Sequence, residues 1–142
     1  MPPNRFRLAG GTAAAHFAGM SQRTQALATW KAINPLRESR SISAPYHNSR
    51  VAAANDHEIR MSVMTAGFEW HSHPNSDEIF FVIEGELLIE LEEREVRLGE
   101  GDLFTVPKGV VHRTRPVGAR SVNLTFERGE AGTVYVCRGC KD

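Results

Sequence analysis

The chain alternates apolar and polar residues over many short segments, and this alternation constrains its fold more than any other feature. It begins at His57, after which Ile59, Met61 and Val63 stand among polar neighbours, with the two-residue period of a half-buried strand. Glycine, proline and other turn formers fill the breaks between segments. Many short strands with few helices predict an all-β fold, either a closed barrel or a double-sheet jelly roll. The later strands are expected over residues 68–73, 78–84, 86–91, 95–98, 103–106, 110–115, 120–126 and 133–136.

Three histidines and one glutamate in these segments form a candidate metal site. His71 and His73 are two residues apart on an expected strand, so their side chains project from the same face. Glu78 follows the turn-forming residues 74–77, and a hairpin there would return its carboxylate to the two imidazoles. His112 supplies a third imidazole. Nitrogen and oxygen donors without a thiolate suit a divalent first-row transition ion and leave room for water or substrate.

These residues resemble the two sequence motifs of the cupin superfamily. The first motif, His-x-His, four residues, Glu, six residues and Gly, is matched from His71 to Gly85. The second, Gly, five residues, Pro-x-Gly, two residues and His, is matched from Gly101 to His112. The resemblance covers about half of the chain, roughly residues 61–126, and two ordered motifs make it specific for the fold.

The chain departs from the family pattern at two positions. Thr65 stands where the family has the leading glycine of the first motif, and Pro116 replaces the asparagine that often ends the second. Neither position is a metal ligand in the family, so the departures concern local turn geometry.

The resemblance implies a double-stranded β-helix, a small antiparallel barrel of the jelly-roll kind, with an ion of iron, manganese, nickel or zinc. By resemblance, His71, His73, Glu78 and His112 hold that ion. It implies no single reaction, because cupins include dioxygenases, isomerases, epimerases, decarboxylases, storage proteins and ligand-binding regulatory domains. Small cupins commonly pair through their N-terminal strands, so the resemblance also implies a homodimer.

Strand parity predicts which side chains surround the site. Glu78 shares its face with Phe80 and Val82, and His112 shares its face with Thr114. We therefore expect a mostly apolar pocket around one polar centre, with Phe80, Val82 and Thr114 as substrate contacts. For Phe80 and Val82, plain core packing is the alternative.

The same parity orients the neighbours of the histidines. Glu69 is expected on their face, either orienting an imidazole or standing at the pocket rim, whereas Phe68 and Trp70 are expected on the opposite face. Asp77 is a rival carboxylate ligand, interpreted here as a turn cap. In residues 120–126 the apolar alternation predicts that Val122, Leu124 and Phe126 fill the barrel while Ser121, Asn123 and Thr125 face away.

Composition excludes several classes of function. The chain has 17 basic and 17 acidic side chains and a pI near 7.0, so it offers no field that would capture nucleic acid. No apolar run approaches the roughly 18 residues needed to cross a bilayer, which predicts a soluble protein without a membrane partner. Cys137 and Cys140 form a lone Cys-x-x-Cys, interpreted as ordinary thiols with a reversible disulfide or adventitious metal binding as alternatives. So few cysteines are consistent with the cytoplasm.

The 142 residues fit one domain with a core of its own. Residues 1–20 are predicted to be a flexible arm, because glycines and polar residues interrupt any export signal, and Met20 is an alternative start. Residues 21–56 are expected to hold a helix over 21–33, ended by Pro35, and then a connecting segment with a short strand at most. Residues 57–142 are the expected barrel.

The leading functional hypothesis is a metal-dependent enzyme, of the oxygenase or isomerase type, that acts on a small organic molecule. No Ser/His/Asp arrangement or phosphate-binding glycine loop competes with the metal site, and no catalytic side chain is assigned. The alternative is a non-catalytic module that binds a metal or small ligand. A purely structural or storage role is disfavoured, since packing alone does not require these four side chains to converge.

Overall fold

The structure, a computed structural model, describes residues 31–139. The arm predicted over residues 1–20, most of the helix predicted over 21–33, and Cys140 lie outside the described residues. Residues 31–34 are not helical. Cys137 is disulfide-bonded, so its interpretation as an ordinary thiol is wrong.

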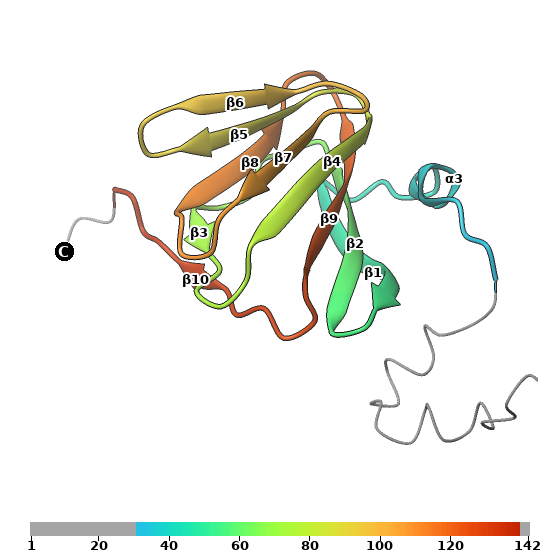
Figure 1. The fold of residues 1–142 in the computed structure, drawn as a ribbon. Helices are drawn as coiled ribbons and strands as arrows, with labels where there is room; N and C mark the ends of the chain where they lie inside the picture. The colour runs from blue at the N-terminus through green and yellow to red at the C-terminus, as the bar shows by residue number, and fades with distance from the viewer. Residues whose placement is uncertain (1–30, 140–142) are drawn as a thin grey trace, which may run out of the picture. The chain divides into compact units, whose positions relative to one another are not determined.

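The described residues form two antiparallel sheets that face each other (Figure 1). One sheet has the order β1-β2-β9-β4-β7 and the other the order β10-β3-β8-β5-β6. The chain crosses repeatedly from one sheet to the other, which is the arrangement of a double-stranded β-helix. The predicted all-β jelly-roll class is confirmed. The strands are β1 (Tyr46–Ala54), β2 (His57–Met64), β3 (His71–Ser72), β4 (Glu78–Glu84), β5 (Leu87–Leu91), β6 (Glu95–Leu98), β7 (Leu103–Val106), β8 (His112–Pro116), β9 (Ser121–Arg128) and β10 (Val134–Tyr135).

A short helix, α3 (Pro35–Ser39), precedes the strands. Proline was expected to end a helix here, yet Pro35 begins one. Its fixed φ suits the first helical turn, where a missing N–H costs nothing, and the Asn34 side chain caps the helix by accepting a hydrogen bond from the Arg37 N–H at 2.9 Å. No helix within residues 31–139 is long and apolar enough to span a membrane.

β1 extends the first sheet further toward the N-terminus than expected. Its residues were predicted to be a loop with a short strand at most, but they form a strand of nine residues that pairs with β2, with an irregularity between Arg50 and Ala52. The hairpin between the two strands turns at Asn55, whose φ of 56° is one that asparagine tolerates. The sheet therefore starts at Tyr46, ahead of the predicted barrel boundary at residue 57.

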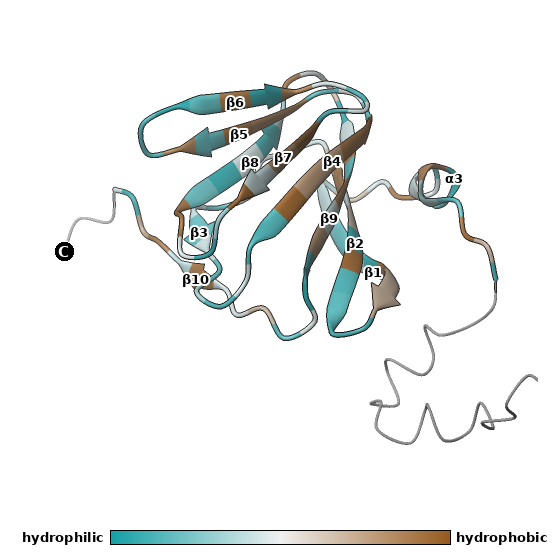
Figure 2. Ribbon diagram, viewed as in Figure 1, coloured by the Kyte–Doolittle hydropathy of each residue, from teal (hydrophilic) through white to brown (hydrophobic). Residues whose placement is uncertain are grey.

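Two hydrophobic clusters lie on opposite faces of the first sheet. The inner cluster draws residues from both sheets and fills one end of the barrel: Met64, Phe80, Val82, Leu87, Ile89, Leu98 and Val106. The outer cluster joins Met61, Val63 and Val122 with partly buried Ile42, Val51, Ile83 and Leu124. Figure 2 shows β4 changing from hydrophilic at its start to hydrophobic farther along.

The assignment of the faces of β9 from its sequence is wrong. Val122 is fully buried, but in the outer cluster, whereas Asn123 and Thr125 are buried on the face toward the barrel cavity. Both faces of this strand are covered, so hydrophobicity alone does not identify the interior one.

Candidate metal centre

Four buried side chains converge near the start of β4. His71 lies on β3 with His73 just after it, Glu78 opens β4 and His112 opens β8. Antiparallel pairing sets His71 directly opposite His112. One potential ligand atom from each of His71, His73, Glu78 and His112 lies within 4.8 Å of all the others. The structure thus brings together all four residues that the sequence singled out.

The protein backbone fixes the orientation of each imidazole. A carbonyl oxygen can only accept, so each Nδ1 carries the proton and each Nε2 is left for the centre of the cluster. A ligand histidine of a metal site needs this arrangement. The Nδ1–H groups donate from His71 to the Glu69 carbonyl at 2.8 Å, from His73 to the Gly132 carbonyl at 2.8 Å and from His112 to the Val110 carbonyl at 2.9 Å.

The Glu78 carboxylate lies between two of the imidazoles. Its Oε2 is 3.0 Å from His112 Nε2 and 3.2 Å from His73 Nε2, although the second contact lacks hydrogen-bond geometry and His73 Nε2 has no hydrogen-bond partner among residues 31–139. Burial alone would raise the pKa of Glu78, but the contacts with His112 and His73 outweigh it and hold the pKa well below its usual range.

The histidines differ in their affinity for protons. Burial lowers the pKa of His71 to about 4, so this ring stays neutral near pH 7. Burial also acts on His73, yet the nearby Glu78 carboxylate overcomes it and raises the pKa of His73 to about 9. In the ion-free protein a proton on His73 therefore balances the charge of Glu78, and a cation binding here must displace that proton.

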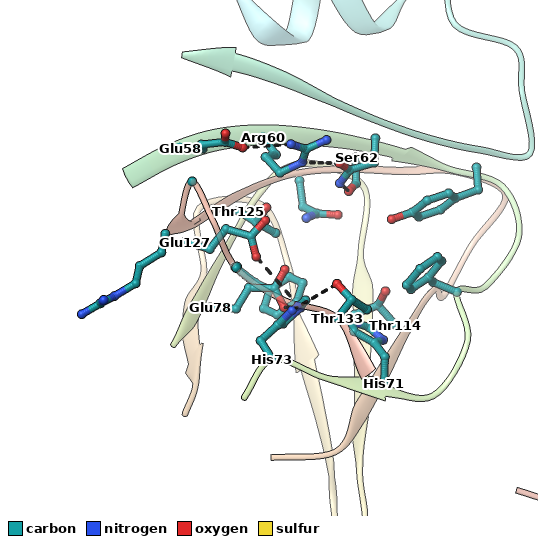
Figure 3. Close-up of a pocket in the computed structure, with 18 of the residues that line it drawn as sticks. Glu58, Arg60, Ser62, His71, His73, Glu78, Thr114, Thr125, Glu127 and Thr133 are labelled. Carbon is teal, nitrogen blue, oxygen red and sulfur yellow. Dashed lines mark hydrogen bonds and ion pairs between the residues drawn. The ribbon is translucent and has the colours of Figure 1, made fainter. Parts of the chain in front are cut away.

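A cavity of about 350 Å³ opens beside the cluster (Figure 3). The prediction of a mostly apolar pocket is wrong, because polar side chains dominate its lining. Phe80 and Thr114 line the cavity as expected, whereas Val82 is absent from the lining and lies fully buried in the inner cluster. The polar lining residues beyond the cluster are Tyr46, Asn48, Glu58, Arg60, Ser62, Thr114, Asn123, Thr125, Glu127, Arg128, Thr133 and Tyr135.

Sequence reasoning missed Glu127, which faces the cluster. Its Oε2 lies 4.0 Å from His73 Nε2, and burial, with the charge of Glu78, raises the pKa of Glu127 to about 7. The two-residue period of β9 could have found it, because this period places Glu127 on the same face as Asn123 and Thr125. That face was predicted to point away from the barrel interior.

Phe68 was predicted to point away from the histidines, and this is wrong. Its ring centroid is 4.9 Å from that of His71, and it stacks on Tyr46 at 4.6 Å. The residues before His71 are not a strand, so the two-residue alternation does not apply to them. Trp70 instead contacts the guanidinium groups of Arg113 and Arg138.

The two carboxylates considered as neighbours lie outside the cluster. Glu69 is exposed, and only its backbone carbonyl reaches His71. Asp77 Oδ1 accepts a hydrogen bond from the Lys108 N–H at 2.8 Å, which ties the turn before β4 to the turn before β8. The Asp77 side chain thus acts as a turn cap.

The residues of the cluster also lie within the region of similarity to known proteins. The family model described as "Cupin domain" matches residues 58–126. The uncharacterized protein YdbB of Bacillus subtilis is 41% identical over 104 residues, which cover 72% of this chain and 91% of YdbB.

Solved structures share the fold. A cupin-2 domain containing protein from Shewanella frigidimarina superposes with a TM-score of 0.63 at 26% identity, covering 68% of this chain and 93% of that one. DMSP lyase DddQ from Ruegeria pomeroyi has a TM-score of 0.57 at 26% identity, covering 78% of this chain and 61% of the lyase chain.

Proposed function

The chain belongs to the cupin family, and from that premise we propose that it is a metal-dependent enzyme, of the oxygenase or isomerase type, acting on a small organic molecule. His71, His73, Glu78 and His112 would hold the ion. The observation that carries the proposal is the convergence of these four buried side chains, within 4.8 Å of one another, beside a cavity of about 350 Å³.

The donor set fits a divalent ion of iron, manganese, nickel or zinc. Three imidazoles whose Nε2 atoms are left for the centre, with one carboxylate and no thiolate, match the preferences of these ions. The Nε2 of His73 is also a buried polar atom without a hydrogen-bond partner in the described part of the chain, and coordination would satisfy it.

When bound, such an ion supplies Lewis-acid or redox chemistry to a substrate. The protein contributes fixed ligand orientation through three backbone carbonyls and a buried setting that limits access of water. Phe80, 4% exposed with its ring 5.9 Å from that of His112, and Thr114 would position the substrate over the cluster. The likeness to DMSP lyase DddQ supports an enzyme role, since that neighbour is an enzyme at 26% identity.

The test starts with protein purified without an affinity tag and analysed for bound elements. We expect about one transition ion per chain in the wild type, loss of the ion in His73→Gln, and no change in His57→Gln. His57 is a matched control because its side chain is exposed and contacts exposed Asp56 rather than the cluster.

Turnover then separates the reaction classes. Oxygen consumption with a candidate substrate supports an oxygenase, whereas conversion to a product of unchanged mass without oxygen uptake supports an isomerase. A stoichiometric ion with no turnover of any candidate would instead support a non-catalytic module that binds metal or a small ligand. An absence of any ion would overturn the proposal.

Family membership also leads us to propose a homodimer, which light scattering would test. The low number of cysteines leads us to propose a cytoplasmic location, which fractionation of the native host would test. The separate arm over residues 1–20 stays a proposal, for limited proteolysis to test, and because β1 pairs with β2 the protected region should begin before the predicted boundary at residue 57.

A further inference from the structure

One wall of the cavity is a row of polar side chains on β9. Asn123, Thr125 and Glu127 alternate along this strand and all line the cavity. Antiparallel pairing places them beside Ser62, Arg60 and Glu58 of β2, respectively. Figure 3 shows Thr125 and Glu127 between the β2 side chains and the histidines. A ligand lying over the metal cluster would therefore meet this row.

The β9 row contains buried polar atoms that the protein does not satisfy. Asn123 and Thr125 are 1% and 2% exposed, yet the Asn123 Nδ2 and Oδ1, the Thr125 Oγ1 and the Glu127 Oε2 all lack a hydrogen-bond partner within residues 31–139. Buried polar groups in folded proteins are nearly always paired, and an unpaired one is destabilising. These atoms line one cavity wall, so they are available to bond a molecule that enters the cavity.

The neighbouring β2 residues are satisfied by the protein itself. Glu58 receives hydrogen bonds from both Arg50, at 2.7 Å, and Arg60, at 2.9 Å. Arg60 also donates to Asn48, which in turn donates to Ser62 at 2.8 Å. These bonds hold the β2 side chains in place beside the β9 row, and the single charge of Glu58 is shared between the two guanidinium groups.

The β9 row itself offers no positive charge to an anionic ligand. Beside it, Arg60 is already engaged by Glu58, and Arg128, the other arginine of the lining, is exposed. The unsatisfied atoms comprise amide and hydroxyl donors and amide, hydroxyl and carboxyl acceptors. A hydroxyl group is both donor and acceptor and carries no charge, so it matches this wall better than a carboxylate or phosphate does.

Aromatic rings form another part of the same cavity. Tyr46 and Phe68 stack with ring centroids 4.6 Å apart, and the ring centroid of exposed Tyr135 lies 6.1 Å from that of Phe68. The C–H face of a sugar-like ring can pack on such a surface while its hydroxyl groups reach polar partners. A volume of about 350 Å³ is at the small end of ligand pockets, which limits the ligand to about one such ring.

We propose that the β9 row binds a neutral polyhydroxylated molecule of monosaccharide size, with hydroxyl groups bonded to Asn123, Thr125 and Glu127. This inference rests on the proposed function, because it takes the cavity beside the metal cluster as the substrate site and names the substrate class.

The binding test uses full-length metal-loaded protein with three sets of probes: neutral hexoses and hexitols, the corresponding uronic acids, and cyclohexanol as a ring with one hydroxyl group. Saturation-transfer NMR ranks the probes and calorimetry measures Kd. We expect at least one neutral polyol to bind, with uronic acids and cyclohexanol at least tenfold weaker. Thr125→Val should weaken binding of that polyol about tenfold, the effect of one lost hydrogen bond, and Asn123→Leu should weaken its binding more.

Thr105→Val is the matched control, because Thr105 is an exposed residue of β7. It should leave polyol affinity unchanged. Without ligand, Thr125→Val should raise the Tm by a few degrees because it removes an unsatisfied hydroxyl, while Thr105→Val should leave it unchanged. This second measurement does not depend on the choice of probe.

Three results would overturn the inference: no neutral polyol binds the metal-loaded protein, uronic acids bind more tightly than their neutral counterparts, or Thr125→Val lowers the Tm without weakening the polyol. Element analysis of the same samples keeps the two proposals apart. Polyol binding by protein that holds no ion would refute only the metal-dependent function, and an ion without polyol binding would refute only the ligand class.

Discussion

At one end of the barrel Leu87, Ile89 and Val106 pack into a dry core, whereas at the other end Asn123 and Glu127 line a polar cavity. The same strands build both ends. Along β4 the inward residues run from Glu78 through Phe80 to Val82, from the metal cluster to the core. The difference teaches that the period of a strand sets which face is inside, while depth along the strand decides whether an inward side chain stabilises the fold or meets a ligand.

The largest effect is expected at the core end. Ile89→Ala removes a fully buried side chain and should lower the free energy of unfolding by about 2–5 kcal/mol, with Ile89→Val costing about 0.5–1.5 kcal/mol. Denaturant titration of the ion-free protein measures both. Thr125→Val, at the cavity end, should not destabilise at all, so equal losses at the two ends would break the comparison.

The next effect concerns the metal. Glu78→Gln keeps the shape of the side chain but removes the charge that balances a cation, and it should weaken metal binding by 100-fold or more, about 2.8 kcal/mol. Competition with a chelator measures the change. An unchanged affinity would mean that the three imidazoles hold the ion without the carboxylate.

Part of this picture could be predicted from the sequence and part could not. His71, His73, Glu78 and His112 were found because strand alternation and motif spacing are local properties of the chain. The orientation of β9 was missed because both of its faces are covered, and the covering residues, such as Ile42 and Val51, are distant in sequence. The direction of the Phe68 side chain was wrongly predicted because the residues just before His71 are not part of a strand. Strand β1 was not predicted because its apolar residues are mostly small alanines.

A pH effect should separate ion-free from metal-loaded protein. The pKa of His73 is raised to about 9 in the ion-free fold, so its protonation stabilises that fold fully below pH 6.5, the ordinary histidine value, and the stabilisation is lost as the pH rises through 9. The lowered pKa of Glu78 stabilises the ion-free fold above pH 4.5, and this stabilisation is lost only in stronger acid. His71, with its pKa lowered to about 4, contributes above pH 6.5 and loses stabilisation between pH 6.5 and 4.

Between pH 6.5 and 9 the Tm of the ion-free protein should therefore fall because of His73, and metal affinity should rise because the proton leaves. Thermal melts and calorimetry in buffers of different ionisation enthalpy would measure the melting and the released proton. His73→Gln, in which that proton is absent, should flatten the ion-free profile. Metal occupancy that stayed constant from pH 9 down to pH 4 would contradict histidine coordination.

The smallest effect is expected one residue away from the site. Asp77→Asn makes the same chemical change as Glu78→Gln on the adjacent residue, but the Asp77 side chain accepts a hydrogen bond from the Lys108 N–H outside the cluster. An asparagine oxygen can still accept that bond, so the free energy of unfolding should change by less than about 1 kcal/mol and metal affinity by less than about threefold. If Asp77→Asn weakened metal binding as strongly as Glu78→Gln does, Asp77 would be a ligand after all. The boundary between structural and functional side chains would then lie within the turn rather than at the first residue of β4.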